Sequence, residues 1–181
     1  HDVRISNVER AEIGNREQAD LAVRIHADGS ESPQVQGISV LYPAQASVSE
    51  ELFSTSRKAS ELMLDALISR TEAVSRGSVP RSDLTGFNWS KVPVILVEMG
   101  FMSNPAEDRR MATDAYRSQL ALGMADGVDA YFAGHPDRLA PEPWDGSLLL
   151  MEKAGIYYRE DSRYVPSGAA LTPQLLKATA R

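Results

Sequence analysis

Two ionisable side chains follow apolar stretches of this sequence and have the types needed for hydrolytic chemistry. His26 comes after the largely apolar stretch 21–25, and Glu98 comes directly after 92–97, a run of valine, proline, isoleucine and leucine. In an open α/β sheet, ligands bind in the crevice beyond the carboxyl ends of the strands. Two strands that each end in an ionisable group at the same edge therefore predict one site built from both.

An imidazole and a carboxylate in such a crevice suit metal-assisted hydrolysis. A catalytic zinc site takes three protein ligands and leaves one position for water, and the metal lowers the pKa of that water to ~7. A nearby glutamate that is not a ligand can accept the proton as hydroxide attacks a carbonyl. His26 fits the ligand role and Glu98 the base role. The alternative is structural: a hydrogen-bonded core histidine, and a strand-end glutamate paired with an arginine.

The strands that must position these residues follow from apolar runs bounded by turn residues. We predict strands over residues 21–27, 37–42 and 92–98, and a first short strand that ends near Ser6. Residues 79–90 are predicted to form a surface segment with one short strand near Leu84.

Helices are predicted between these strands from apolar spacing and capping residues. One covers about 8–18, capped by Ser6 or Asn7, and the next runs from Ser49 to about Ser75, with Arg76 in its last turn and Gly77 as its stop. Two more begin after Asn104 and near Thr113, the second ending at Gly134. The alternation favours an α/β fold, with a twisted, mostly parallel sheet flanked by helices.

The character of the sequence changes after Gly134. The stretch 136–146 is rich in proline and predicts a linker, whereas residues 156–159 and 163–165 predict a small hairpin. We therefore expect a domain over 1–134, and a linker and C-terminal extension of unknown role over 135–181.

Composition narrows the class of protein. With 43% apolar and 24% charged residues among 181, the chain is expected to form a packed core. A net charge of −6 argues against a nucleic-acid partner, because such proteins carry a basic surface. There is no cysteine, which excludes disulfides, thiolate ligands and a cysteine nucleophile. No apolar run approaches the ~20 residues of a transmembrane helix.

Short motifs in a fixed order run through residues 2–133. They are Arg10 with Gly14-Asn15, Ala19-Asp20-Leu21, Ile25-His26-Ala27-Asp28, residues 37–42, Arg76-Gly77, residues 93–105 and the helix 116–131. In 93–105, a strand ends in Glu and is followed by Gly-Phe, an apolar residue, Ser and Asn. Together these motifs resemble the zinc-dependent N-acetylmuramoyl-L-alanine amidases, the Amidase_3 family of bacterial cell-wall hydrolases.

The resemblance implies both a fold and an activity. The family hydrolyses the amide between N-acetylmuramic acid and the L-alanine of the stem peptide, on a twisted, mostly parallel sheet flanked by helices. His26 matches a zinc ligand of the family, and Glu98 matches its catalytic glutamate. The resemblance implies zinc as cofactor, peptidoglycan as partner and a location outside the cytoplasm. A regulatory partner is left open.

The sequence also departs from the family. The family's opening strand, its Gly-His-Gly-Gly loop and its first helix, which carry two zinc ligands, have no match here. His1 lies about five residues, at ~3.3 Å each, from the edge that faces the site, and His135 follows the last helix with no strand before it. We therefore expect these residues alone to bind zinc weakly and not to catalyse, the other ligands lying upstream of His1.

Two further functions stay open at this point: a metal-free wall-binding or regulatory module on the same fold, and a zinc carboxypeptidase-like hydrolase. Several other residues near these two also allow either a functional or a structural role. Asp28 can orient His26, contact substrate or serve as a turn acid, and Arg24 can pair with an acid. Phe87 and Trp89 can stack on a sugar or peptide, or can pack at the edge of the core.

Overall fold

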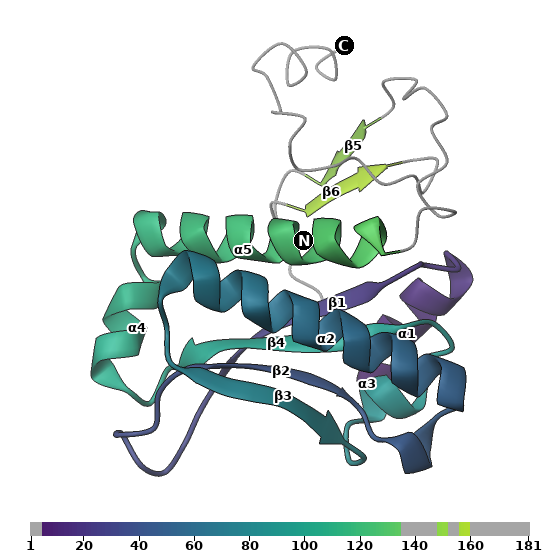
Figure 1. The fold of residues 1–181 in the computed structure, drawn as a ribbon, viewed down its shortest axis with the longest axis horizontal. Coiled ribbons are helices and arrows are strands. Elements are labelled where there is room, and N and C mark those ends of the chain that lie inside the picture. The colour runs from purple at the N-terminus through teal and green to yellow at the C-terminus, as the bar shows by residue number, and fades with distance from the viewer. Residues whose placement is uncertain (1–4, 135–147, 152–155, 160–181) are drawn as a thin grey trace.

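The computed structural model describes residues 5–134, 148–151 and 156–159, the last two as backbone only. Four strands form one sheet in the order β1-β4-β2-β3 (Figure 1). They are β1 (Ala22–Asp28), β2 (Ile38–Pro43), β3 (Ser75–Arg81) and β4 (Val94–Phe101). The pairs β1–β4 and β2–β3 are parallel, whereas the central pair β2–β4 is antiparallel. The predicted α/β class is confirmed, with a mixed sheet.

Helices flank the sheet, and most of their first turns are capped as the sequence predicts. They are α1 (Asn7–Arg16), α2 (Glu50–Thr71), α3 (Thr85–Asn88), α4 (Pro105–Met111) and α5 (Asp114–Ala133), with the 3-10 turn η1 (Gln45–Ser47). The side chains of Ser6, Ser49, Asn104 and Thr113 accept backbone N–H groups at the starts of α1, α2, α4 and α5. No helix in the described ranges is long and apolar enough to cross a bilayer.

The helices α2 and α5 pack on each other and cover one face of the sheet (Figure 1). Alternate strand residues and the inner sides of both helices form the main core, which includes Ile38, Val40, Ile95, Val97, Met63, Leu67, Leu120 and Tyr131, each at most 2% exposed. The two helices approach closely at Gly127, where an added Cβ would lie 2.8 Å from the Met63 Cα.

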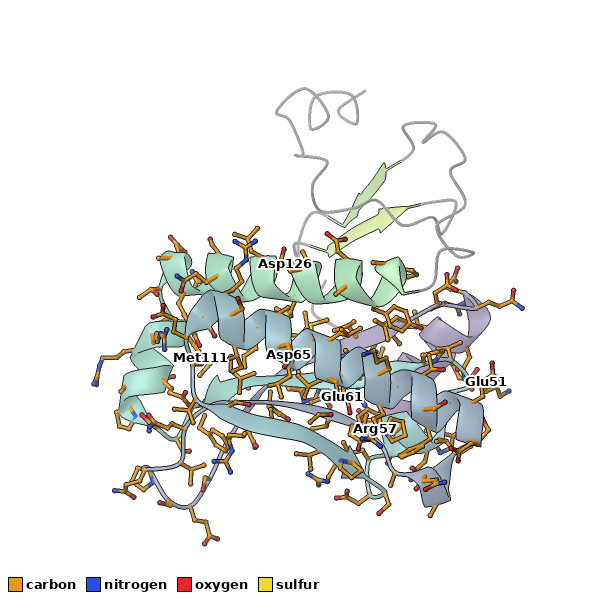
Figure 2. The ribbon with its side chains drawn as sticks, in the orientation of Figure 1. Glu51, Arg57, Glu61, Asp65, Met111 and Asp126 are labelled. Atoms are coloured by element: carbon orange, nitrogen blue, oxygen red, sulfur yellow. The ribbon has the colours of Figure 1, made fainter. Side chains whose placement is uncertain are left out.

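The outer surfaces of these two helices are charged. Figure 2 shows Glu51, Glu61 and Asp65 on α2 and Asp126 on α5. Arg70 of α2 forms an ion pair with Asp126 at 2.5 Å, which links the helices on their solvent side. Exposed pairs of this kind add little to stability, so burial between α2, α5 and the sheet holds this layer together.

The other face of the sheet is much less covered. The strand residues that alternate with those of the main core form a second, smaller cluster, in which Leu41, Val94 and Leu96 pack against Phe87 of α3. Beyond this cluster the face carries polar and charged side chains. This unequal covering leaves an open cleft.

The end of α2 differs from the prediction. The helix ends at Thr71, where Glu72 adopts a left-handed conformation with φ 53° and donates its N–H to the Ile68 carbonyl. The prediction that it runs to about Ser75, with Arg76 in the last turn and Gly77 as the stop, is therefore wrong. Residues 75–81 form β3 instead, an edge strand, where Pro80 is tolerated because an outward-facing position needs no N–H donor.

The prediction for residues 79–90 is wrong as well. The strand lies earlier than Leu84, and residues 85–88 form α3 rather than a surface segment. Phe87 is fully buried because it fills the smaller cluster. The proline, glycine and aromatic residues of this segment are typical of a loop, but residues 85–88 form a short helix that packs Phe87 against the sheet.

Both ends of the chain carry predictions that lie partly outside the described residues. Ser6 is not in a strand but begins α1, in a capping box with Glu9. The rest of that predicted strand and the predicted linker lie outside the described ranges. Strand β6 (Ile156–Arg159) is present as predicted, but its antiparallel partner is β5 (Leu148–Met151), and the predicted partner 163–165 is not among the described residues.

Candidate active site

The parallel pairing of β1 with β4 places His26 directly beside Glu98. The two residues are register partners, four residues after Ala22 pairs with Val94. The same alternation that sends Ile95 and Val97 to the main core turns Glu98 to the opposite face, and both His26 and Glu98 line the cleft there. The structure thus brings together the two residues that the sequence analysis singled out.

The register shifts immediately after this pair. Asp28 pairs with Phe101, so β4 has one residue more than β1 over this interval. Gly100 lies in this longer interval of β4 and has a backbone φ of 145°, which residues other than glycine rarely adopt. The Glu-Met-Gly-Phe sequence therefore encodes a bulge that bends β4 just beyond the carboxylate.

The cleft has a volume of about 560 Å³ and draws residues from all four strands. Leu41, Val79 and Leu96 form its apolar part. Charged groups of both signs surround them, and these are Arg24, Arg76, Arg81, Asp28 and Glu98. A polar ligand that makes several directed contacts fits such a lining better than an apolar one.

Glu98 has the electrostatics of a proton-transfer group. Its side chain is only 9% exposed, and burial, together with the charge of Asp28, raises its pKa to about 7, against the opposing effect of Arg81. Within the described part of the chain, its buried Oε2 atom has no hydrogen-bond partner. A buried acceptor of this kind normally has one, so the described surroundings stabilise the ionised form of Glu98 poorly.

His26 stands at the solvent-accessible side of the cleft. Burial, Arg24 and Arg10, in that order, lower its pKa below the ordinary value, so the imidazole is neutral at pH 7. Neutral imidazole is the form that ligates a metal ion. Nevertheless, the described residues contain no group of three His, Cys, Asp or Glu side chains that could hold one. They contain a single imidazole, that of His26, and do not form a zinc site by themselves.

Asp28 serves mainly as a turn acid. Its Oδ1 atom accepts the Gly29 N–H at 2.7 Å, and its carbonyl accepts the Met102 N–H at 2.9 Å, so it fixes the two loops beyond the strand ends. No hydrogen bond joins it to His26 in the described ranges. Its effect on the site is electrostatic, through the raised pKa of Glu98.

Glu107 has a larger role than the capping that its position suggests. Its carboxylate accepts the Phe101 N–H at 2.8 Å and the Gly37 N–H at 2.9 Å, at the end of β4 and the start of β2. It thereby ties the end of β4 to the start of β2, where Ser39 pairs with Glu98. The sequence shows an acid at the third position of a helix but gives no indication of a partner 70 residues away.

The remaining candidates fall into three groups. Phe87 belongs to the smaller core cluster, and Trp89 is 54% exposed and does not line the cleft. His1 and His135 lie outside the described residues. Arg24 lines the cleft, but the prediction that it pairs with an acid is not met within the described ranges, where its hydrogen bond goes to Asn7.

Comparison with known proteins shows the family to which this chain belongs. The model of the Amidase_3 family, N-acetylmuramoyl-L-alanine amidase, matches residues 1–130, and the chain belongs to this family. The resemblance seen in the sequence is thereby confirmed.

Individual relatives carry the same name. The amidase AmiA of Escherichia coli is 27% identical over 68% of this chain and 56% of its own length, and an amidase of Mycobacterium tuberculosis is 31% identical over 69% and 53%. An amidase structure from Clostridium difficile 630 superposes with a TM-score of 0.67 at 27% identity, covering 73% of this chain and 68% of that one. The chain spans about half the length, or less, of the curated relatives it matches.

Proposed function

We propose that this protein hydrolyses the amide bond between N-acetylmuramic acid and the L-alanine of the peptidoglycan stem peptide. The observation that carries the proposal is the register pairing of His26 with Glu98 at one cleft, in a chain of the amidase family. Because peptidoglycan lies outside the cytoplasm, we place the protein there too.

In this proposal Glu98 moves the proton. Its carboxylate accepts a proton from the attacking water and passes it to the nitrogen of the leaving L-alanine. A group with a pKa of about 7 exists in both forms at neutral pH and can therefore do both steps. Glu98 lines the cleft, so its carboxyl group borders the space in which that water would lie.

His26 is proposed as one ligand of a zinc ion, whose further ligands would come from outside the described residues. When bound, zinc supplies the acidity of the attacking water. The described residues contribute the neutral imidazole of His26 and the cleft that it shares with Glu98.

A second candidate is a wall-binding module that holds no metal. It is favoured by one observation, the lack of a three-ligand group among the described residues. It shares the peptidoglycan partner but not the chemistry, so product analysis separates the two.

The experiment is hydrolysis of purified peptidoglycan by the full-length protein in H₂¹⁸O, with mass spectrometry of the products and metal analysis of the protein. We expect stem peptides with a free L-alanine amine, ¹⁸O in the lactyl carboxylate of the muramic acid, bound zinc, and loss of activity on chelation. Binding to peptidoglycan without any cleavage would favour the module, and cleavage at another bond would contradict the proposal.

A further inference from the structure

A second group in the cleft is not used by the proton transfer. Arg24 lies two residues before His26 in β1, on the same face of the strand, and lines the same cleft. A smaller adjoining hollow, lined among others by Asn7, Arg10 and Arg24, continues from it. The guanidinium therefore stands beside the reacting groups on a rigid strand.

No carboxylate neutralises this guanidinium within the described ranges. Its hydrogen bond goes to the neutral Asn7, from Nη2 to Oδ1 at 2.8 Å, and the charged group that lowers its pKa, after the effect of burial, is another cation, Arg10. Charged side chains that leave water are normally paired. By contrast, Arg81 on the other side of the cleft forms an ion pair with Asp83.

The guanidinium also sits in a space shaped for it. A Cβ atom at Gly86 would lie 1.7 Å from Arg24 Nη1 and 2.8 Å from its Cζ, so the side chain rests on the backbone of α3 where only glycine leaves room. Asn7 at the start of α1 holds the other nitrogen. Two elements thus fix the direction of the planar group before any ligand arrives.

We propose that Arg24 determines specificity by binding a carboxylate of the stem peptide. This inference rests on the proposed amidase function. A fixed guanidinium matches a carboxylate with two parallel hydrogen bonds. Two strand residues span about 7 Å, and L-alanine together with the next stem residue spans about the same distance from the scissile bond. The carboxylate of the second stem residue, when it is not amidated, is therefore the group within reach.

The test compares two synthetic muropeptides that differ only at this group, one with a free α-carboxylate on the second stem residue and one with the carboxamide. Full-length wild-type protein, Arg24→Ala and Arg24→Lys are assayed for kcat/KM on both. Gly86→Ala displaces the guanidinium without replacing it, and Lys58→Ala on α2 removes one positive charge away from the cleft.

We expect wild type to prefer the carboxylate by about 10- to 100-fold, the range for hydrogen bonds to a charged group. Arg24→Ala should abolish that preference by lowering kcat/KM on the carboxylate form alone. Arg24→Lys should keep part of it, Gly86→Ala should reduce it, and Lys58→Ala should leave it intact. Equal rates on both forms in wild type, or an unchanged preference in Arg24→Ala, would overturn the inference.

Binding of the released peptides, with free or amidated second residue, is measured by calorimetry and needs no hydrolysis. If wild type cleaves neither muropeptide, the amidase proposal fails, and the binding preference still decides the role of Arg24. If Arg24→Ala fails to fold, Gly86→Ala and Arg24→Lys give the same decision.

Discussion

On β4, Ile95 and Val97 face α2 and α5, whereas Leu96 and Glu98 face the cleft. One side of the same strand is closed by two long helices that bury apolar side chains completely. The other side has a small apolar cluster, an ionisable carboxyl with a buried oxygen that has no hydrogen-bond partner, and an arginine without an acidic partner, all within the described part of the chain. The packed face supplies stability, and the cleft face accepts a cost in stability for groups that can bind and transfer protons.

The largest effect on stability should come from a cavity in the packed face. Leu67 on α2 is fully buried, so Leu67→Ala should lower the free energy of unfolding by about 2–5 kcal/mol. The matched change Leu122→Ala, at a side chain that is 51% exposed on α5, should cost less than about 0.5 kcal/mol. Denaturant unfolding measures both, and equal costs would mean that α2 does not seal the core.

A smaller loss of stability is expected where Glu107 joins the end of β4 to the start of β2. Glu107→Ala removes the acceptor for the backbone N–H groups of Gly37 and Phe101, and should cost about 1–3 kcal/mol. Glu51, also in the first turn of its helix, is exposed, so Glu51→Ala should cost less than about 1 kcal/mol. If Glu107→Ala is as mild as this control, Glu107 does not hold β2 against β4.

A substitution on the cleft face should raise the free energy of unfolding, whereas those on the packed face lower it. Below pH 4.5 the Glu98 carboxyl is protonated in both the folded and unfolded states, but between 4.5 and about 7 only the unfolded state ionises, so folding loses stability as pH rises. In chelator-treated protein, Glu98→Gln should therefore be more stable than wild type at pH 8, by about 1–2 kcal/mol once screening by water in the open cleft is included, and little different near pH 4.

Thermal unfolding at the two pH values measures this difference. If Glu98→Gln were less stable than wild type at pH 8, the folded protein would stabilise the ionised Glu98 carboxylate, which would contradict its raised pKa.

Local sequence was sufficient for much of this architecture. Ser49, Asn104 and Thr113 mark helix starts because a cap depends on neighbours within three residues. The pairing of His26 with Glu98 followed from apolar runs that end in ionisable residues, since parallel strands present their ends at one edge.

Features that depend on distant contacts were beyond the sequence pattern. The left-handed stop at Glu72 and the antiparallel pairing of β2 with β4 both arise from how the chain packs, not from local preference. The partners of Glu107 and the cradle of Arg24 at Gly86 join residues far apart in the chain. Local sequence cannot show that both carboxylate oxygens of Glu107 accept hydrogen bonds, or that Arg24 has no acidic partner among the described residues.

The most direct test of the account is the rate of peptidoglycan cleavage by Glu98→Gln, measured beside its unfolding temperature. We predict a loss of about 10²- to 10⁴-fold in kcat, the usual contribution of a general acid–base group, in a protein that is folded and no less stable than wild type. Glu61→Gln, which alters an exposed ion pair on α2 (Figure 2), should keep the wild-type rate. A folded Glu98→Gln protein that cleaves as fast as wild type would contradict the assignment of proton transfer to this cleft.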